Sequence, residues 1–187
     1  LGKGLEMDGK KVLLIDADPQ SSLTLSLGID NPDDLEISLS TVMQDIMEDR
    51  NSDPMEGLIK TEEGIWLMPS NILLSGTETA LFNTMSRENI LKNCIQKMKG
   101  CFDYVLIDCM PSLGMMTINA LTAADSVIIP TQPNYLSAKG MDLLFRSIAK
   151  VRRSINPDLK IDGILMTMVD GRTNNAREII ATLRESI

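Results

Sequence analysis

The sequence contains no histidine among its 187 residues. Histidine-based catalytic triads, histidine proton shuttles and histidine metal sites are therefore excluded. Aromatic residues make up only 3% of the chain, whereas methionine occurs 13 times, which indicates a core filled by aliphatic and thioether side chains. The three cysteines form no C-x-x-C pair, so free thiols are expected rather than a disulfide framework.

Two further features are missing from the chain. No apolar run is long enough to span a membrane and no signal peptide is visible, so we expect a cytoplasmic protein without a membrane partner. The phosphate-binding signature G-x-x-x-x-G-K-[ST] does not occur either. A net charge of −8 argues against a generally basic nucleic-acid-binding surface, but not against a local patch. Acidic residues are concentrated over 30–63, whereas 139–184 is richer in Lys and Arg.

What the chain does contain is an alternation of short apolar segments with longer helical ones. Strands are expected over 11–17, 64–69, 103–108, 126–130 and 161–169. Helices are expected over 19–27, 37–60, 73–99 with a break near 84–86, 117–124, 138–155, and from 173 onward. This order favours right-handed βαβ units and a parallel sheet, and the length suits one domain of the α/β class.

The strand over 11–17 ends in two carboxylates. Its run of Val and Leu residues up to Ile15 suits a strand buried on both faces, and Asp16 and Asp18 follow at its carboxyl end. Ligands of open α/β sheets bind beyond this end of the strands. Pro19 suits the first turn of a helix with Asp18 as its N-cap, and a helix N-terminus favours anions.

A second strand, over 103–108, also ends in a carboxylate, Asp108. An apolar strand that ends in Asp is typical of a Walker B magnesium site, and equally of an ordinary strand end. The string V-L-I-D-C-M-P-S-L-G over 105–114 is followed by T-I-N-A-L over 117–121. Three further strings are D-A-D-P-Q over 16–20, A-D-S-V-I-I-P-T-Q over 124–132 and G-I-L-M-T-M-V-D-G-R-T-N over 163–174. Taken together, these strings resemble those of the ParA-type ATPases, which are deviant-Walker relatives of the P-loop NTPases. The resemblance covers nearly the whole chain and departs from the family at Met110, where a proline is usual.

The resemblance implies a three-layer, mostly parallel, doubly wound sheet that is incomplete at both ends. Residues 1–187 would be a fragment of one ATPase domain, with the phosphate loop and first strand upstream of Leu1 and further elements beyond Ile187. Residues 1–8 would end the helix that follows the phosphate loop, and Gly9 would stop it. Without the phosphate loop, the fragment itself is expected not to hydrolyse ATP.

The resemblance also implies roles for individual residues. Asp18 would be catalytic by orienting or deprotonating the attacking water, and Asp108 would bind Mg²⁺ with Asp16 in its outer coordination sphere. The remaining implied roles are contacts to the nucleotide by Gln132, Pro133, Met168 and Asp170, and to DNA by Arg172. Two plainer interpretations stay open: Asp18 as a helix cap only, and Arg172 in a surface ion pair with Asp170 or Glu178.

The function implied is hydrolysis of ATP with Mg²⁺ by a cytoplasmic, nucleoid-associated protein that moves plasmid, chromosomal or mobile-element DNA. Its partners would be a second copy of the chain, held with ATP, non-specific DNA and a stimulating ParB-type protein. Three alternatives remain open: a MinD-like ATPase that cycles on membranes, a relative of cofactor-biosynthesis amidotransferases, and a partner-binding module without hydrolysis.

Overall fold

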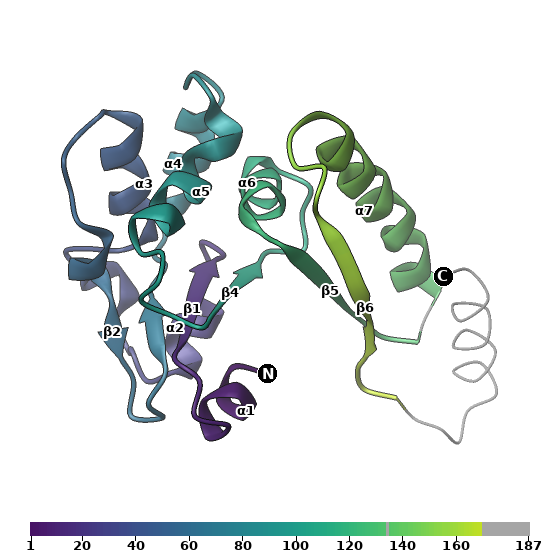
Figure 1. The fold of residues 1–187 in the computed structure, drawn as a ribbon, viewed down its shortest axis with the longest axis horizontal. Coiled ribbons are helices and arrows are strands. Elements are labelled where there is room, and N and C mark those ends of the chain that lie inside the picture. Colours follow the sequence, from purple (N-terminus) through teal and green to yellow (C-terminus); the bar gives the residue numbers. More distant parts are fainter. Residues whose placement is uncertain (134, 170–187) are drawn as a thin grey trace. The chain divides into compact units, whose positions relative to one another are not determined.

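The structure is a computed structural model that describes residues 1–133 and 135–169, with the side chains of 135–139 left out (Figure 1). The chain divides into two compact units, residues 1–123 and 124–187. The strands of the first unit form a four-stranded sheet, and those of the second form a two-stranded sheet. The expectation that all 187 residues form a single domain stays a prediction.

The first unit has a sheet with the strand order β2-β3-β1-β4, in which β1 runs parallel to β3 and to β4, and β2 runs antiparallel to β3. The strands are β1 (Val12–Ala17), β2 (Ile59–Lys60), β3 (Trp66–Met68) and β4 (Tyr104–Cys109). The α-helices are α1 (Gly2–Met7), α2 (Ser22–Ser26), α3 (Leu39–Met47), α4 (Leu74–Leu81), α5 (Ile90–Lys97) and α6 (Met115–Ala123). Three short 3-10 helices complete the unit: η1 (Pro32–Asp34), η2 (Pro54–Gly57) and η3 (Arg87–Asn89).

The central strand β1 is buried on both faces, as its apolar run predicts. Leu13 and Ile15 belong to the core that the sheet shares with α3, α4, α5 and α6, and full burial of each contributes about 1.5–3 kcal/mol. Successive strand residues point to opposite faces, so Leu14 and Asp16 point away from that core. There, a Cβ built on Gly2 would lie 2.9 Å from Leu14 Cδ2, and Asp16 contacts α2. Helices therefore lie on both faces, which confirms the predicted doubly wound α/β class.

Most expected elements of the first unit are present, but two helices are shorter than expected, one of them α2, which begins at Ser22 instead of near Pro19. The break within 73–99 falls between α4 and α5, and Gly9 ends α1 with a φ of 77°. The helix expected over 37–60, however, ends at Met47. Asp49 adopts a φ of 54°, and Pro54 cannot continue a helix, so the chain forms η2 and β2 instead.

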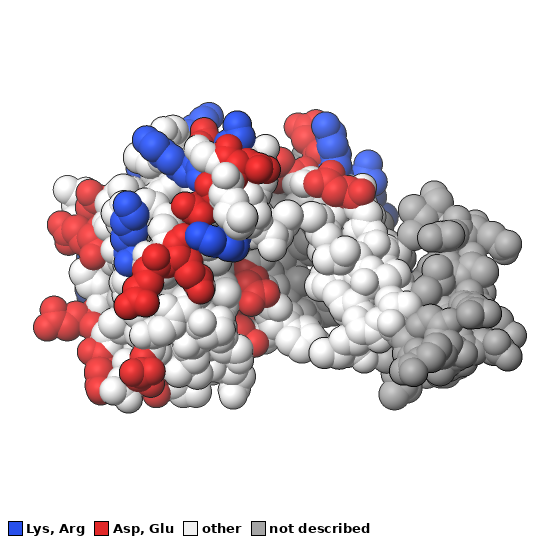
Figure 2. Space-filling view, turned by 90° about the horizontal axis from the view of Figure 1, so that it is seen from below, with Lys and Arg blue, Asp and Glu red and all other residues white. Residues whose placement is uncertain are grey.

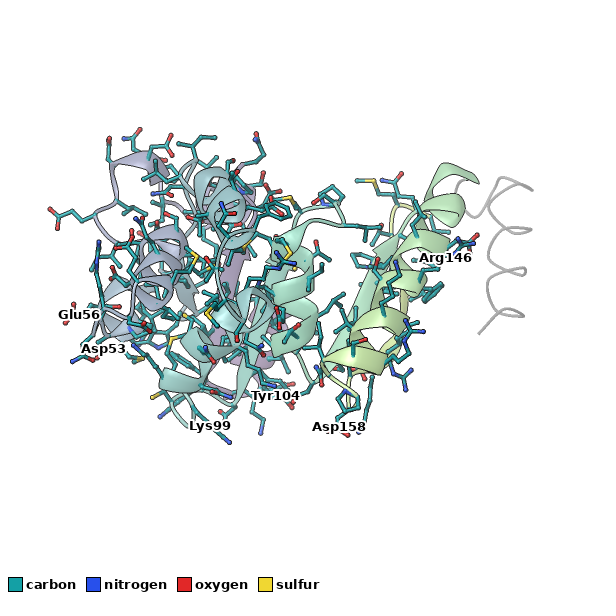
Figure 3. All side chains as sticks on the ribbon, turned by 90° about the horizontal axis from the view of Figure 1, so that it is seen from above. Asp53, Glu56, Lys99, Tyr104, Arg146 and Asp158 are labelled. Carbon is teal, nitrogen blue, oxygen red and sulfur yellow. The ribbon has the colours of Figure 1, made fainter. Side chains whose placement is uncertain are left out.

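The second unit is a βαβ unit. Strands β5 (Ser126–Thr131) and β6 (Lys160–Met166) pair in parallel and are joined by α7 (Tyr135–Ser154). Met141, Ile148 and Val151 form the buried stripe of α7, whereas Arg146 is exposed and points outward in Figure 3. Among the residues that the structure describes, no helix combines the length and apolarity needed to cross a bilayer.

Cys94 lies fully buried on α5, and burial raises the pKa of its thiol from 9.0 to about 12, with a smaller opposing effect from Lys97. The folded protein therefore retains this proton where the unfolded chain loses it, between pH 9 and 12. We expect the free energy of unfolding to fall above pH 9, by at most about 1.4 kcal/mol per pH unit from this thiol. Urea unfolding at about pH 8 to 10.5 measures this change in the free energy of unfolding with pH. The change should be smaller in the C94A variant, whereas C101A, which replaces an exposed thiol, should leave it as in wild type. Equal slopes for wild type and C94A would contradict the prediction.

Candidate functional site

Three carboxylates meet at the carboxyl edge of the first sheet. β1 and β4 pair in register so that Asp16 lies opposite Asp108, and registered partners of parallel strands point to the same face. Partial burial raises the pKa of the Asp108 carboxyl above its usual range, and the negative charges of Asp16 and Asp18 raise it further. Asp18 and Asp108 therefore lie at the same rim of the sheet.

Asp16 is fully buried, and its carboxylate is occupied by hydrogen bonds. Its Oδ2 accepts from the Thr24 amide at 2.8 Å and from the Thr24 hydroxyl at 2.7 Å, and its Oδ1 accepts from the Asp18 amide at 3.2 Å. A carboxylate offers about four lone-pair positions, so three of them are used inside the protein. This arrangement makes Asp16 an anchor for the loop that carries Asp18.

Asp18 remains half-buried at the start of that loop. Its Oδ1 accepts from the Gln20 amide at 2.9 Å and closes a turn, while Ser21 adopts a left-handed φ of 56° before α2 begins at Ser22. Asp18 is thus a turn residue, and the expectation that it caps a helix beginning at Pro19 is wrong. Its second oxygen, Oδ2, accepts no hydrogen bond within the described part of the chain.

The residue Asp108 is exposed although its carboxyl group is partly shielded from solvent, and two helices hold the loop that follows it. The Thr117 hydroxyl on α6 donates to the Ser112 carbonyl at 2.6 Å. Glu78 on α4 accepts from the Met116 amide at 3.2 Å, and a side chain at Gly114 would collide with the same Glu78 oxygen. These contacts hold the loop at Ser112 and at the start of α6, beyond Met110, which stands where a more rigid proline is usual.

Asn119, in the middle of the T-I-N-A-L string, is a structural residue. It is fully buried, accepts from the Leu91 amide at 3.1 Å, and donates to the Arg87 carbonyl at 2.9 Å and the Met115 carbonyl at 3.0 Å. It therefore joins α6 to the beginning of α5. No local pattern indicated this role, or the roles of Thr24 and Glu78, because all three depend on contacts between distant segments.

The described residues include no group of three or more His, Cys, Asp or Glu side chains that would hold a metal by themselves. Two carboxylates, those of Asp18 and Asp108, do lie at the edge, and the outer oxygen of Asp18 has no hydrogen bond among the described residues. Mg²⁺ prefers oxygen ligands and is usually held by one or two carboxylates together with substrate phosphates and water. The donor set fits such a shared site and does not fit a cage made by protein alone.

The second unit carries the other predicted site residues. Gln132 follows β5 and donates through Nε2 to Met168 Sδ at 3.1 Å, so the ends of the two parallel strands are joined. Met168 is 83% exposed and adopts a φ of 52°, and Pro133 is half-buried. Asp170 and Arg172 lie outside the described residues. The contacts predicted for these five residues stay predictions.

This chain is similar to a protein family, to curated proteins and to solved structures. A family described as an AAA domain matches residues 1–161. The sporulation initiation inhibitor protein Soj of Bacillus subtilis is 41% identical over 99% of this chain and 71% of its own length, and the chromosome partitioning protein ParA of Myxococcus xanthus is 37% identical over 98% and 63%. A crystal structure described as cobyrinic acid a,c-diamide synthase from Mycobacterium smegmatis, with a bound ATP analogue and magnesium, superposes with a TM-score of 0.91 at 41% identity, covering 100% of this chain and 74% of that one.

Proposed function

This chain belongs to the ParA/Soj family of P-loop ATPases, and from that membership we propose that it forms the central part of an enzyme that hydrolyses ATP with Mg²⁺ to partition DNA. The observation that carries the proposal is the register of Asp16 against Asp108, with Asp18 two residues further along the same edge. The chain spans 71% of the length of Soj and 63% of that of ParA, so the proposal concerns a longer protein that supplies the phosphate-binding loop.

In this proposal each carboxylate has a separate task. Asp108 binds the magnesium ion at the exposed end of β4, directly or through water, and Mg²⁺ supplies charge neutralisation for the phosphates when it is bound. Asp18 accepts a hydrogen bond from the attacking water through its outer oxygen, Oδ2, and so orients it. Asp16 would lie in the outer coordination sphere of Mg²⁺, and it also holds the Asp18 loop through the hydrogen bond from the Asp18 amide.

The proposed partners are a second copy of the chain, held with ATP, non-specific DNA and a ParB-type stimulating protein. Membership of the ParA family supports them, and Arg172 is the residue proposed for contact with DNA phosphates. On the face shown in Figure 2, the described Lys and Arg side chains lie singly or in small groups among acidic ones. With a net charge of −8, DNA binding would therefore depend on a few local cations, and its affinity would fall with salt in proportion to the number of phosphates that these cations neutralise.

ATP turnover tests the proposal directly. We expect the complete protein to release phosphate from ATP in the presence of Mg²⁺, to lose this activity when EDTA removes the metal, and to turn over faster with DNA and the partner protein. The 187-residue chain, assayed in parallel, should release none. A complete, folded protein without Mg²⁺-dependent turnover would refute the proposal.

A second candidate is supported by one comparison. The structural neighbour from Mycobacterium smegmatis is described as a cobyrinic acid a,c-diamide synthase, and its sequence is 41% identical to that of this chain. This similarity favours an ATP-dependent amidation of a corrinoid acid. The same turnover assay separates the two functions. ATP hydrolysis that requires a corrinoid acid and a nitrogen donor such as glutamine supports amidation, whereas hydrolysis stimulated by DNA and a partner protein supports partitioning.

A further inference from the structure

A buried chain of hydrogen bonds lies behind the three carboxylates and joins two separate loops. The Thr24 hydroxyl on α2 donates to Asp16 Oδ2 at 2.7 Å and accepts from the Ser70 amide at 3.0 Å. Thr24, Asp16 and Ser70 are all fully buried. The Ser70 hydroxyl has no partner among the described residues, so its amide alone makes the connection. We call these three residues the buried relay.

Each end of the buried relay is attached to a loop at the carboxyl edge of the sheet. At one end, Asp16 accepts from the Asp18 amide and so fixes the turn that carries Asp18. At the other, Ser70 leads from β3 to α4, and the next residue, Asn71, accepts from the Ser40 hydroxyl on α3 at 3.0 Å. Thr24 is the member of the relay that connects the two loops, because its single hydroxyl is donor to one and acceptor from the other.

The geometry points to Thr24 as a positioning residue for the reaction proposed above: its hydroxyl couples the β3–α4 loop to Asp16 and thereby sets the position of the Asp18 carboxylate. A buried hydroxyl that both donates and accepts cannot be replaced by an apolar group without leaving the Ser70 amide and one Asp16 lone pair unsatisfied. The Asp16 carboxylate then keeps the hydrogen bonds from the Thr24 and Asp18 amides but loses the one from the hydroxyl, so it shifts, and the Asp18 amide bonded to it shifts as well. The expected change in kcat rests on the proposed ATP hydrolysis, whereas the expected coupling between the two loops does not.

Two substitutions separate the hydroxyl of Thr24 from its volume. T24V keeps the shape and removes the hydroxyl, and T24S keeps the hydroxyl. In the complete protein we expect T24V to lower kcat at least about 10-fold with KM for ATP within about 3-fold, because displacements of order 1 Å at a reacting centre cost up to about 100-fold. T24S should restore kcat to within about 3-fold of wild type. The matched control is T77V, which removes a buried hydroxyl on α4 that donates only to the Leu73 carbonyl of its own helix.

Amide hydrogen exchange on the 187-residue chain provides a measurement that does not involve ATP. In T24V the amides of Asp18 and Ser70 should exchange at least about 10-fold faster than in wild type, and in T24S and T77V they should stay protected. Unchanged exchange at Asp18, or equal losses of kcat in T24V and T77V, would overturn the inference. Absence of turnover in the wild-type protein, with the exchange pattern intact, would instead refute the proposed function alone.

If T24V does not fold, amide hydrogen exchange in the wild-type chain tests the inference instead. Under native conditions with increasing denaturant, the amides of Asp18, Thr24 and Ser70 should open with one shared free energy below that of global unfolding. Opening of Asp18 independently of Thr24 and Ser70 would show that the buried relay does not couple the two loops, and would overturn the inference.

Discussion

Replacing Asp18 by asparagine should lower kcat for ATP hydrolysis by the complete protein about 10²–10⁴-fold, the range associated with loss of a positioned proton acceptor. Asparagine has the same shape, and its Oδ1 can still accept from the Gln20 amide, so the turn is retained. What is lost is the negative charge and the acceptor at the outer position, where the amide nitrogen can only donate. KM for ATP should stay within a few-fold of wild type, since Asp18 acts on the water rather than on the bound nucleotide. Phosphate release under saturating ATP and Mg²⁺ measures the effect.

D53N is the matched control for D18N. Asp53 also closes a turn by accepting from the amide two residues later, Met55, at 2.9 Å, and it lies at the start of η2 (Figure 3). Both variants should unfold at similar temperatures, but D53N should keep wild-type kcat. A folded D18N protein with kcat within about 3-fold of wild type would mean that Asp18 only closes its turn.

Replacing Asn119 by alanine should destabilise the first unit by about 3–5 kcal/mol. The substitution removes the acceptor of the buried Leu91 amide and the donor to the part-buried Arg87 carbonyl, and both groups then lack this partner. Each such group costs about 1–3 kcal/mol, and the cavity left by the side chain adds to the loss. Because total stabilities of domains are about 5–15 kcal/mol, the loss is a large share. Urea unfolding of the 187-residue chain measures it through the transition midpoint and slope.

Asn93 offers the same chemical change at an exposed position of α5. N93A should alter the free energy of unfolding by no more than about 0.5 kcal/mol. A loss of less than about 1 kcal/mol for N119A would contradict the assignment of Asn119 as the connection between α6 and α5.

Periodicity and apolar runs predicted those parts of the molecule that local sequence determines. The strand ending at Asp16, the strand ending at Asp108 and the break between α4 and α5 all follow from apolar runs and turn residues. The parallel pairing follows from the alternation of strands and helices, and it implies that Asp16 and Asp108 share an edge. The register that places them directly opposite each other depends on packing between β1 and β4, which a local pattern does not encode.

The supporting contacts of the site could not be predicted in the same way. Thr24 reads as an ordinary polar residue of a short helix, and only the fold brings the Ser70 amide, 46 residues later, to its hydroxyl. Likewise, the sequence around Glu78 indicates only a solvated helix residue, and the fold alone brings the Gly114 backbone close to its carboxylate. The helix α3 is shorter than the helix expected over 37–60, because the left-handed conformation at Asp49, just beyond its end, has no marker such as glycine in the sequence.

The position of β4 has a consequence for the behaviour of the first unit in solution. Among the described residues, β4 pairs only with β1, and Tyr104 at its start is 44% exposed (Figure 3). Its outer row of amide and carbonyl groups is a template to which any extended peptide can add as a further strand. At high concentration, the 187-residue polypeptide is thus predisposed to self-association through strand addition at this edge of the first unit.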